Sequence, residues 1–284
     1  MVQCVIFGGL ILDRYYEVDR FPQRGQDAII TGEFSVVGGC SINMAATFNN
    51  LGGRAHVVSC LGRGPIGEAL HQYLHDHRFS QRFVYPVEED SGYCDVFLEP
   101  DGERTFFSRK GAEKRVPPDL KPEDLSGIAA AAVTGYYLLD EPEPVLSLLE
   151  DFSRRGGKVL VDLGPLLDRL APETVRRALD AASVITANNT EAALLGLEER
   201  TAQIVVIKKG ARGGSVTAPG LAFDYSPAPA RVVDTTGAGD SFDAGLLYGL
   251  ATNMDLRDAV ALGAACAAKT IAIMGPHGFW EMKL

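Results

Sequence analysis

The sequence predicts an α/β fold with three layers, in which helices cover both faces of a mostly parallel central sheet. Apolar, strand-like runs alternate with stretches of helical spacing along most of the 284 residues. The strand-like runs, such as "KVLVDLG", "SVITANN" and "QIVVIKKG", are apolar on both faces. Strands of this kind belong to parallel sheets that are buried on both sides. Two segments depart from this rhythm and predict a second, smaller sheet.

The expected elements follow one another in a regular order. "CVIFGG" predicts the first strand, and "INMAATFNNLGG" has helical spacing and ends in two glycines, as a helix end does. "AHVVSCLG" predicts a strand, "IGEALHQYLHDH" a helix, "FVYPV" a short strand and "AAAAVTGYYLL" another strand. The helices "PEPVLSLLEDFSRRGG" and "PETVRRALDAA" each begin with a proline, which suits the first turn.

The two exceptional segments are residues 13–34 and 91–110. Both alternate polar and apolar residues, and the second contains a "PDGE" turn between two strand-like runs. This pattern is typical of antiparallel ribbons. The simplest arrangement joins the two segments as a small β-sheet lid over the ligand end of the main sheet. We expect residues 1–284 to form a single domain, because α/β folds of this length often do.

Composition and charge exclude several classes of protein. The chain is 46% hydrophobic and 23% charged, which is ordinary for a globular protein. Its net charge of -10 disfavours a nucleic acid or an anionic membrane as partner. The five cysteines are odd in number and form no C-x-x-C pair, which indicates free thiols in a reducing compartment. The start of the chain lacks a basic leader and no apolar stretch is long enough to span a membrane, so we expect a cytoplasmic protein.

The stretch "DTTGAGDSF", residues 234–242, stands directly before an apolar run of helical spacing. The amides at a helix start have no intrahelical partner, and the helix dipole favours an anion there. Gly237, Ala238 and Gly239 would let a phosphate approach these amides closely. Asp240 would then accept a proton from a hydroxyl that attacks the phosphate, which is what phosphoryl transfer requires. A simple helix cap would explain the aspartates and glycines but not three small residues together.

With its neighbours, this stretch resembles a known family. "DTTGAGDSFDAGLL" is similar, position for position, to the C-terminal signature of the ribokinase-like (phosphofructokinase-B) carbohydrate kinases. "GGCSINMAATFNNLGGRAHVVSCLG", residues 38–62, resembles their N-terminal signature, although Ser41 stands where Gly, Ala or Pro is usual. "NNTEA" resembles their N-x-x-E, and "IKKGARGG" their loop near the nucleotide. The resemblance covers nearly the whole chain and implies a ribokinase-like fold.

The resemblance also implies a reaction: transfer of the γ-phosphoryl group of ATP to a hydroxyl of a small carbohydrate or nucleoside, with Mg²⁺. Asp240 would be the general base, and Gly237, Ala238 and Gly239 the anion hole. Asn188 and Glu191 would act around Mg²⁺ and the ATP phosphates through water, which suits this hydrated ion. Lys208 and Gly210 would lie beside the nucleotide.

The remaining implied roles concern the sugar, a second cation and the lid. Asp13, Gly38, Gly39 and Asn43 would hold the sugar, because Asp and Asn offer directional partners to hydroxyls. Asp234 and Thr236 resemble ligands of the monovalent-cation (K⁺) site found in part of the family. The lid often also forms a homodimer interface.

Each role has a structural alternative. Asp13 could end a strand in a turn, and Asn43 could be satisfied by backbone. Asn188 and Glu191 could form a helix N-cap with an acid in the first turn, which their spacing also fits. Asp162, at the end of a strand, suits a cap as well as a site. Arg104, Arg109 and Lys110 of the second inserted segment are expected to be solvated lid charges, with contact to the substrate as the alternative.

The sequence departs from the family at three further places. Ile11 stands where ribokinase has a polar residue, which disfavours ribose as substrate. "GRGPIG" lacks the acid that often follows its first glycine. The interval from Glu191 to Lys208 is short, so one wall near the nucleotide is expected to be reduced.

Three rival interpretations remain open. "GRGPIG", residues 62–67, matches G-x-G-x-x-G between a strand and a helix, with Glu88 placed as a ribose-binding acid would be, so a dinucleotide-binding oxidoreductase is an alternative. His71 and His75 could place two metal ligands on one helix face, although a solvated face fits better. A non-catalytic sugar-binding regulator of the same fold is the third alternative.

Overall fold

The computed structural model describes residues 1–197, 200 and 202–275. Its strands are β1 (Gln3–Phe7), β2 (Ile11–Val18), β3 (Ile30–Gly38), β4 (Arg54–Gly62), β5 (Val84–Val87), β6 (Tyr93–Leu98), β7 (Arg104–Arg109), β8 (Ala130–Thr134), β9 (Lys158–Asp162), β10 (Val184–Asn188), β11 (Ile204–Lys208), β12 (Gly214–Ala218) and β13 (Leu221–Tyr225). Its α-helices are α1 (Cys40–Asn50), α2 (Pro65–Asp76), α3 (Pro142–Arg154), α4 (Pro172–Ala181), α5 (Asn189–Leu195), α6 (Ala238–Ala251) and α7 (Leu256–Thr270).

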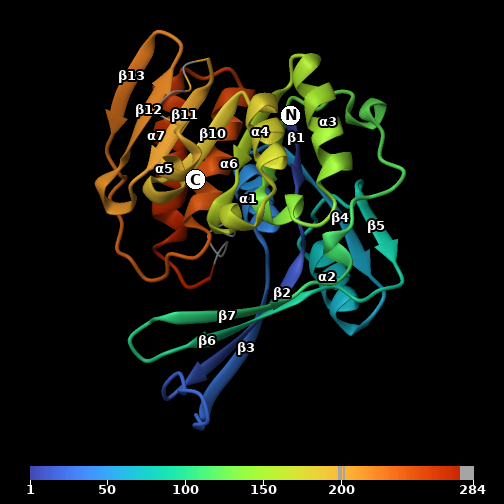
Figure 1. The fold of residues 1–284 in the computed structure, drawn as a ribbon, viewed down its shortest axis with the longest axis vertical. Coiled ribbons are helices and arrows are strands. Elements are labelled where there is room, and N and C mark those ends of the chain that lie inside the picture. Colours follow the sequence, from blue (N-terminus) through green and yellow to red (C-terminus); the bar gives the residue numbers. More distant parts are fainter. Residues whose placement is uncertain (198–199, 201, 276–284) are drawn as a thin grey trace.

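The main sheet has the strand order β13-β12-β11-β10-β9-β8-β1-β4-β5 (Figure 1). Pairing is parallel from β11 through to β5, and antiparallel between β11 and β12 and between β12 and β13. The predicted mostly parallel sheet is confirmed. The strand expected over "AAAAVTGYYLL" is shorter than predicted, because β8 ends at Thr134 and Gly135–Leu138 form a 3₁₀ turn. A Cβ on Gly135 would lie only 1.9 Å from the carbonyl oxygen of Leu163.

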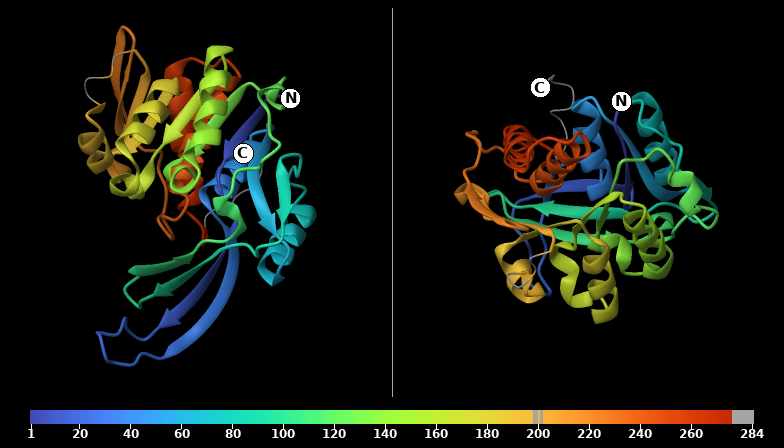
Figure 2. Two further views of the ribbon diagram at one scale, coloured as in Figure 1. Left: turned by 45° about the vertical axis from the view of Figure 1, so that its right-hand side comes forward. Right: turned by 90° about the horizontal axis from the view of Figure 1, so that it is seen from above.

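Helices cover both faces of the main sheet, which confirms the three layers. Seen from above, α1, α2, α6 and α7 lie on one face and α3, α4 and α5 on the other (Figure 2). The strands alternate between the two cores: in β1, Val5 and Phe7 pack with α3 and α4, while Cys4 and Ile6 pack with α1 and α6. In α1 every residue from Ser41 to Phe48 is buried, because this helix lies between the sheet and α6.

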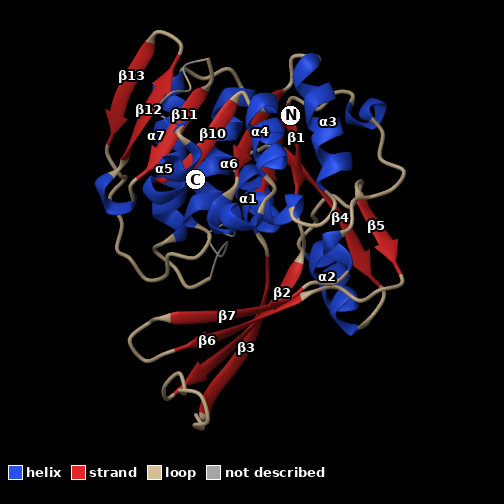
Figure 3. Cartoon of the chain, viewed as in Figure 1, coloured by secondary structure: helices blue, strands red, loops and turns tan. Residues whose placement is uncertain are grey.

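A second sheet, here called the small sheet, has the order β3-β2-β6-β7. β2 pairs with β3 and β6 with β7 in antiparallel fashion, and β2 joins the two ribbons by parallel pairing with β6. The two inserted segments therefore form one sheet, as predicted. It projects beyond the carboxyl ends of the parallel strands (Figure 3). No α-helix within the described residues has both the length and the apolar character needed to cross a bilayer.

The order of the main sheet reverses between β1 and β8. From β1 the chain continues through the small sheet to β4 on one side, whereas from β8 it adds strands on the other side. Ligands of open α/β sheets bind at the carboxyl ends of the strands near such a reversal. The fold thus places a binding site between the main sheet and the small sheet.

Candidate active site

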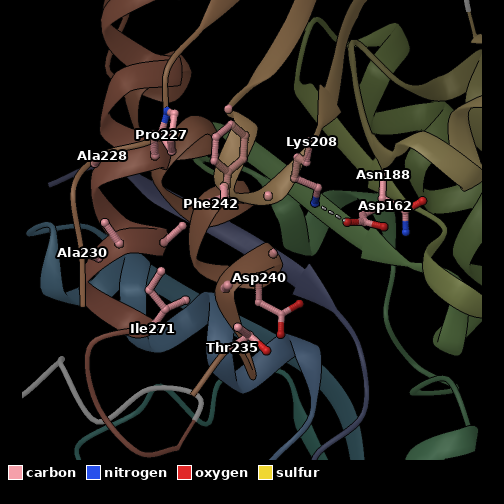
Figure 4. Close-up of a pocket in the computed structure, with 18 of the residues that line it drawn as sticks. Asp162, Asn188, Lys208, Pro227, Ala228, Ala230, Thr235, Asp240, Phe242 and Ile271 are labelled. Carbon is pink, nitrogen blue, oxygen red and sulfur yellow. Dashed lines mark hydrogen bonds and ion pairs between the residues drawn. The ribbon is translucent and has the colours of Figure 1, made fainter. Parts of the chain in front are cut away.

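A pocket of about 740 Å³ lies at the carboxyl ends of β8 to β11. Asp162, Asn188 and Lys208, the last residues of β9, β10 and β11, form one wall (Figure 4). The first turn of α6 forms the facing wall. The residues predicted to bind the nucleotide or to catalyse the reaction that line this pocket are Asn188, Glu191, Lys208, Gly210, Ala238, Gly239 and Asp240. The structure therefore brings two separate motifs into one cavity.

The N-terminus of α6 presents backbone amides without protein acceptors. Gly237, the residue before the helix, has φ 74° and gives no side-chain cap. Ala238 N–H donates to the carbonyl of Thr235 in the turn, but the amides of Gly237, Gly239 and Asp240 donate to no described residue. Amides at a helix start that lack a partner are a ready site for an anion. This geometry is what an anion hole would need, and the role of these residues stays a prediction.

The carboxylate of Asp240 lies beside these amides and accepts a hydrogen bond from a residue far away in the sequence. Asn43 Nδ2, on α1, donates to Asp240 Oδ2 at 2.8 Å. Burial raises the pKa of Asp240 to about 6, although the hydrogen bond from Asn43 opposes this rise. The carboxylate is therefore ionised at neutral pH yet basic enough to accept a proton.

Asp13, Gly38 and Gly39, the other residues predicted to hold the sugar, lie where β2 and β3 of the small sheet meet α1. A Cβ on Gly38 would lie 2.0 Å from Asp13 Oδ2, and a Cβ on Gly39 would lie 2.5 Å from the carbonyl oxygen of Gly9. Gly39 also has φ 102°, which favours glycine. The described residues give Asp13 no hydrogen bond or ion pair, and burial raises its pKa to about 7. Asp13 thus has free acceptors, as a ligand-binding carboxylate does.

The unusual Ser41 has a local explanation. Its hydroxyl donates to the carbonyl of Gly9 at 2.8 Å, and its side chain is fully buried. A Cβ on Gly8 would lie 2.7 Å from the Cβ of Ser41, so the chain after β1 passes directly over the start of α1. The serine therefore holds together two segments that border the site.

Lys208 lies in a cluster of charges that sequence reasoning did not find. Its Nζ contacts Asp162 Oδ2 at 2.8 Å and both carboxylate oxygens of Asp243 at 3.1 Å. Burial alone would lower the pKa of Lys208, but the two carboxylates raise it, so the ammonium stays charged. Burial raises the pKa of Asp243 and the adjacent Asp162 raises it further. Only the position of Asp162 at a strand end indicated a role from sequence.

Asn188 and Glu191 adopt the capping arrangement that was their structural alternative. Asn188 Oδ1 accepts from Glu191 N–H at 3.0 Å, and Glu191 Oε2 accepts from Asn188 N–H at 2.8 Å. Both residues also line the pocket, so the cap and the predicted site coincide. Burial raises the pKa of Glu191, and the carboxylate of Asp162 adds to this rise. The interval between α5 and β11 includes residues 198, 199 and 201, which lie outside the described part.

The small sheet reaches the loop before α6 through one arginine. Arg104 Nη2 donates to Asp234 Oδ1 at 2.7 Å, and its Nη1 donates to the hydroxyl of Thr236. The expectation of solvated charges is therefore wrong for Arg104, whose side chain is only 18% exposed. Lys110 pairs with Asp140, and Arg109 is exposed on its strand.

The rival G-x-G-x-x-G turn precedes α2 and is filled by the protein itself. Asp90 accepts from the amide of Gly67 at 2.9 Å and from that of Ile66 at 3.4 Å. A Cβ on Gly64 would lie 2.3 Å from Asp90 Cγ. Glu88, the expected ribose ligand, pairs with Arg63 at 2.6 Å on the surface. A dinucleotide pyrophosphate would have to displace the Asp90 carboxylate.

The two histidines of the metal alternative lie on the exposed side of α2. His71 and His75 are both exposed, and His75 Nδ1 lies 3.2 Å from Asp76. Within residues 1–197, 200 and 202–275, no group of three His, Cys, Asp or Glu side chains is placed to hold a metal ion.

The fold and the site together define a class, the α/β phosphotransferases that act on an alcohol group. The chain belongs to the pfkB family of carbohydrate kinases, because the family's sequence model matches residues 1–281. The chain is 27% identical over 295 residues to the uncharacterized sugar kinase YegV of Escherichia coli, which covers 95% of this chain and 89% of the relative.

Solved structures share the fold at lower identity. A nucleoside kinase of Burkholderia thailandensis in complex with inosine has a TM-score of 0.83 at 22% identity, covering 97% of this chain and 93% of that one. The ribokinase of Arabidopsis thaliana complexed with ribose and ATP has a TM-score of 0.83 at 23% identity, covering 97% and 94%. The ribokinase-like fold predicted from the motifs is confirmed.

Proposed function

We propose that this protein transfers the γ-phosphoryl group of ATP to a hydroxyl of a small carbohydrate or nucleoside, with Asp240 as general base. One observation carries the proposal: the amides of Gly237, Gly239 and Asp240 have no acceptor among the described residues, and the Asp240 carboxylate lies beside them. Relatives and structural neighbours named as ribokinases and nucleoside kinases support the same chemistry.

The reaction needs two groups at this helix start. The Asp240 carboxylate accepts the proton of the acceptor hydroxyl while its oxygen forms a bond to the γ-phosphorus. The bond from that phosphorus to the β,γ-bridging oxygen breaks, and ADP leaves. The free amides donate to the phosphoryl oxygens, where charge is held in the transition state. Asn43 keeps the carboxylate oriented, because its amide nitrogen donates to Oδ2.

The rest of the pocket suits the nucleotide. Apolar side chains border it at one end: Pro227, Ala228, Ala230, Phe242 and Ile271. Such a surface fits the base of a nucleotide, and the volume of the pocket is in the range of ordinary ligand sites. Lys208 and Gly210 lie at the same pocket, and the Lys208 cluster holds a permanent ammonium near the phosphates.

The residues at the ends of β9 and β10 and in the first turn of α5 fit a hydrated Mg²⁺. Their donor set is hard, with the Glu191 carboxylate, the Asn188 amide and the Asp162 carboxylate on one wall. The raised pKa of Glu191 shows a desolvated carboxylate that a nearby cation would stabilise. Two oxygens of this set serve the α5 cap, which favours contact through water. When bound, Mg²⁺ would neutralise phosphate charge.

A screen of ADP release over sugars, sugar acids, sugar phosphates and nucleosides tests the proposal. For the best acceptor, Asp240→Asn should lower kcat by at least about a hundredfold, the usual scale for a lost general base. The matched control is Asp258→Asn, an exposed acid in the first turn of α7, which should keep the wild-type rate. Near-normal kcat in Asp240→Asn would contradict the assigned role.

The pH dependence adds an independent measurement. The base must be ionised, so wild-type kcat/KM should rise with pH through about 6, the pKa of Asp240, and then level off. The pKa of Asp240 in the folded protein lies above its ordinary value. The free energy of unfolding should therefore fall as pH rises through that folded-state pKa. Asp240→Asn should therefore be at least as stable as wild type at pH 8.

Two other outcomes would favour the rival functions. NAD⁺ binding without ATP turnover would favour the dinucleotide-binding oxidoreductase. Sugar binding without any ATP-dependent phosphorylation would favour the non-catalytic regulator.

We also propose that the small sheet forms a homodimer with a second copy of the chain. Ile29, Ile30, Phe106 and Phe107 on or beside it are each more than half exposed. Its outer strands β3 and β7 leave free edges, which pair readily with other chains. Light scattering should give a mass twice the 30.4 kDa of the chain. In Phe106→Ser the measured mass should fall toward that of a single chain. A monomeric wild type would refute this interface.

A further inference from the structure

Both oxygens of the Asp234 carboxylate accept hydrogen bonds from donors within the protein. Its Oδ1 accepts from Thr236 N–H at 2.9 Å and from Arg104 Nη2 at 2.7 Å. Its Oδ2 accepts from Gly275 N–H at 3.0 Å. The residue is only 3% exposed, and these donors hold the pKa of its carboxyl below the ordinary value against the effect of burial. The carboxylate is therefore charged, buried and hydrogen-bonded at both oxygens.

A monovalent cation does not fit this arrangement. Asp234 and Thr236 are the residues whose pattern predicted such an ion, but the Arg104 guanidinium already contacts both of them. A second cation there would meet a fixed positive charge within a few ångströms and would be repelled. The guanidinium is planar and permanently charged, so it can bind a carboxylate and a hydroxyl at the same time.

We propose that Arg104 is a built-in cation that replaces the monovalent ion and joins the small sheet to the anion-hole loop. Arg104 begins β7, which is hydrogen-bonded through β6 to β2, the strand that carries Asp13. Thr236 directly precedes Gly237, so the arginine links the proposed sugar-binding sheet to the amides that hold the phosphoryl group. Arg104 is thus a positioning residue. The part of this inference that concerns turnover rests on the proposed kinase function.

The burial of the Arg104 side chain leaves one of its nitrogens without a partner. Arg104 Nε is a buried nitrogen without a hydrogen-bond partner among the described residues. An unpaired buried donor costs stability, so the other contacts of this side chain must offset that cost. Arg109, on the same strand as Arg104, is exposed, and its guanidinium carbon lies 5.9 Å from the centre of the Tyr93 ring on β6. Its side chain is not held by buried contacts of this kind.

The test compares Arg104→Gln with Arg109→Gln, which removes the same charge from the same strand without touching the loop. Thermal midpoints are measured in potassium chloride and in tetramethylammonium chloride at equal ionic strength, so that screening is constant. Wild type and Arg109→Gln should show no specific response to K⁺. Arg104→Gln should unfold about 5 °C lower in tetramethylammonium, because a buried charge loses its partner, and K⁺ should recover part of that loss.

Turnover provides the second readout. Wild-type kcat should be the same in both salts, whereas Arg104→Gln should lose about tenfold in tetramethylammonium through misplacement of the loop, with partial rescue by K⁺. If Arg104→Gln does not fold, Arg104→Lys replaces it in the test. Lysine keeps the charge but lacks the two guanidinium nitrogens that contact Asp234 and Thr236, so this variant should show the same pattern more weakly. A wild-type midpoint that rises specifically with K⁺, or an Arg104 variant indifferent to K⁺, overturns the inference. The midpoints do not require kinase activity, so failure of the proposed function would appear separately.

Discussion

Two helices, α2 and α6, begin with glycine-rich turns at the carboxyl side of the main sheet, and their N-termini are occupied differently. At α2 the Asp90 carboxylate accepts from the amides of Gly67 and Ile66. At α6 no side chain caps the helix, and the acid in the first turn, Asp240, is held aside by Asn43. Both turns match a phosphate-binding pattern in sequence, but among the described residues only the second leaves amides of its helix's first turn, those of Gly239 and Asp240, without an acceptor.

The difference shows that a glycine-rich turn identifies an anion site only when the protein leaves its amides unused. The first-turn amides of any helix favour negative charge. Where a carboxylate of the protein supplies that charge, the turn is structural. Where the nearest carboxylate is turned toward another helix, an external anion can bind. The two turns can therefore be separated by substitutions that change stability at one and activity at the other.

Among the substitutions that test this difference between the two turns, Asp90→Ala is expected to have the largest effect on stability. Three amides, those of Ile66, Gly67 and Ser91, lose a charged acceptor, so the free energy of unfolding should fall by about 3 kcal/mol. Urea denaturation measures it. Glu68→Ala, which removes an exposed acid from the same first turn, should change stability by less than about 0.5 kcal/mol. Equal stability of the two variants would mean that Asp90 does not fill the turn.

A smaller pair of effects is expected from adding one methyl group at each turn. In Gly64→Ala the new Cβ would lie 2.3 Å from Asp90 Cγ, so stability should fall by about 1–3 kcal/mol. In Gly239→Ala the nearest atom is Lys208 Nζ at 3.6 Å, so stability should stay constant or rise by about 0.5 kcal/mol.

The activities should show the opposite order. Gly239→Ala adds a methyl group to a residue whose own amide has no acceptor among the described residues. Under the proposed function kcat should fall about tenfold, because the phosphoryl group could no longer approach the amides closely. Steady-state kinetics on folded protein, with Gly64→Ala assayed below its unfolding transition, measures both. A Gly239→Ala enzyme with full activity would break the distinction between the two turns.

Local patterns allowed much of this molecule to be predicted from its sequence. The strand and helix order, the small sheet and the α6 loop follow from periodicity and from residues adjacent in the chain. Asn188 and Glu191, the capping pair, lie three residues apart, so their cap could also be predicted from local spacing. Their motif context indicated a site and their spacing a cap, and the structure shows that one pair can serve a cap while it lines the pocket.

The contacts that sequence reasoning missed join distant residues. Arg104 meets Asp234 across 130 positions, and Lys208 meets Asp162 across 46. Asp90 fills a turn that lies 23 residues before it. In each case both partners are ordinary charged residues, and only the folded chain determines which charge neutralises which. Long-range pairing of this kind leaves no periodicity or spacing in a single sequence.

The hydrogen bond from Asn43 to Asp240 spans 197 positions, and this has a consequence during synthesis on the ribosome. The N-terminal signature emerges early and can pack on its first strands, but the acid that it orients is translated near the end. A nascent chain would therefore lack the proposed catalytic arrangement until its last helices have docked, even with abundant nucleotide around it.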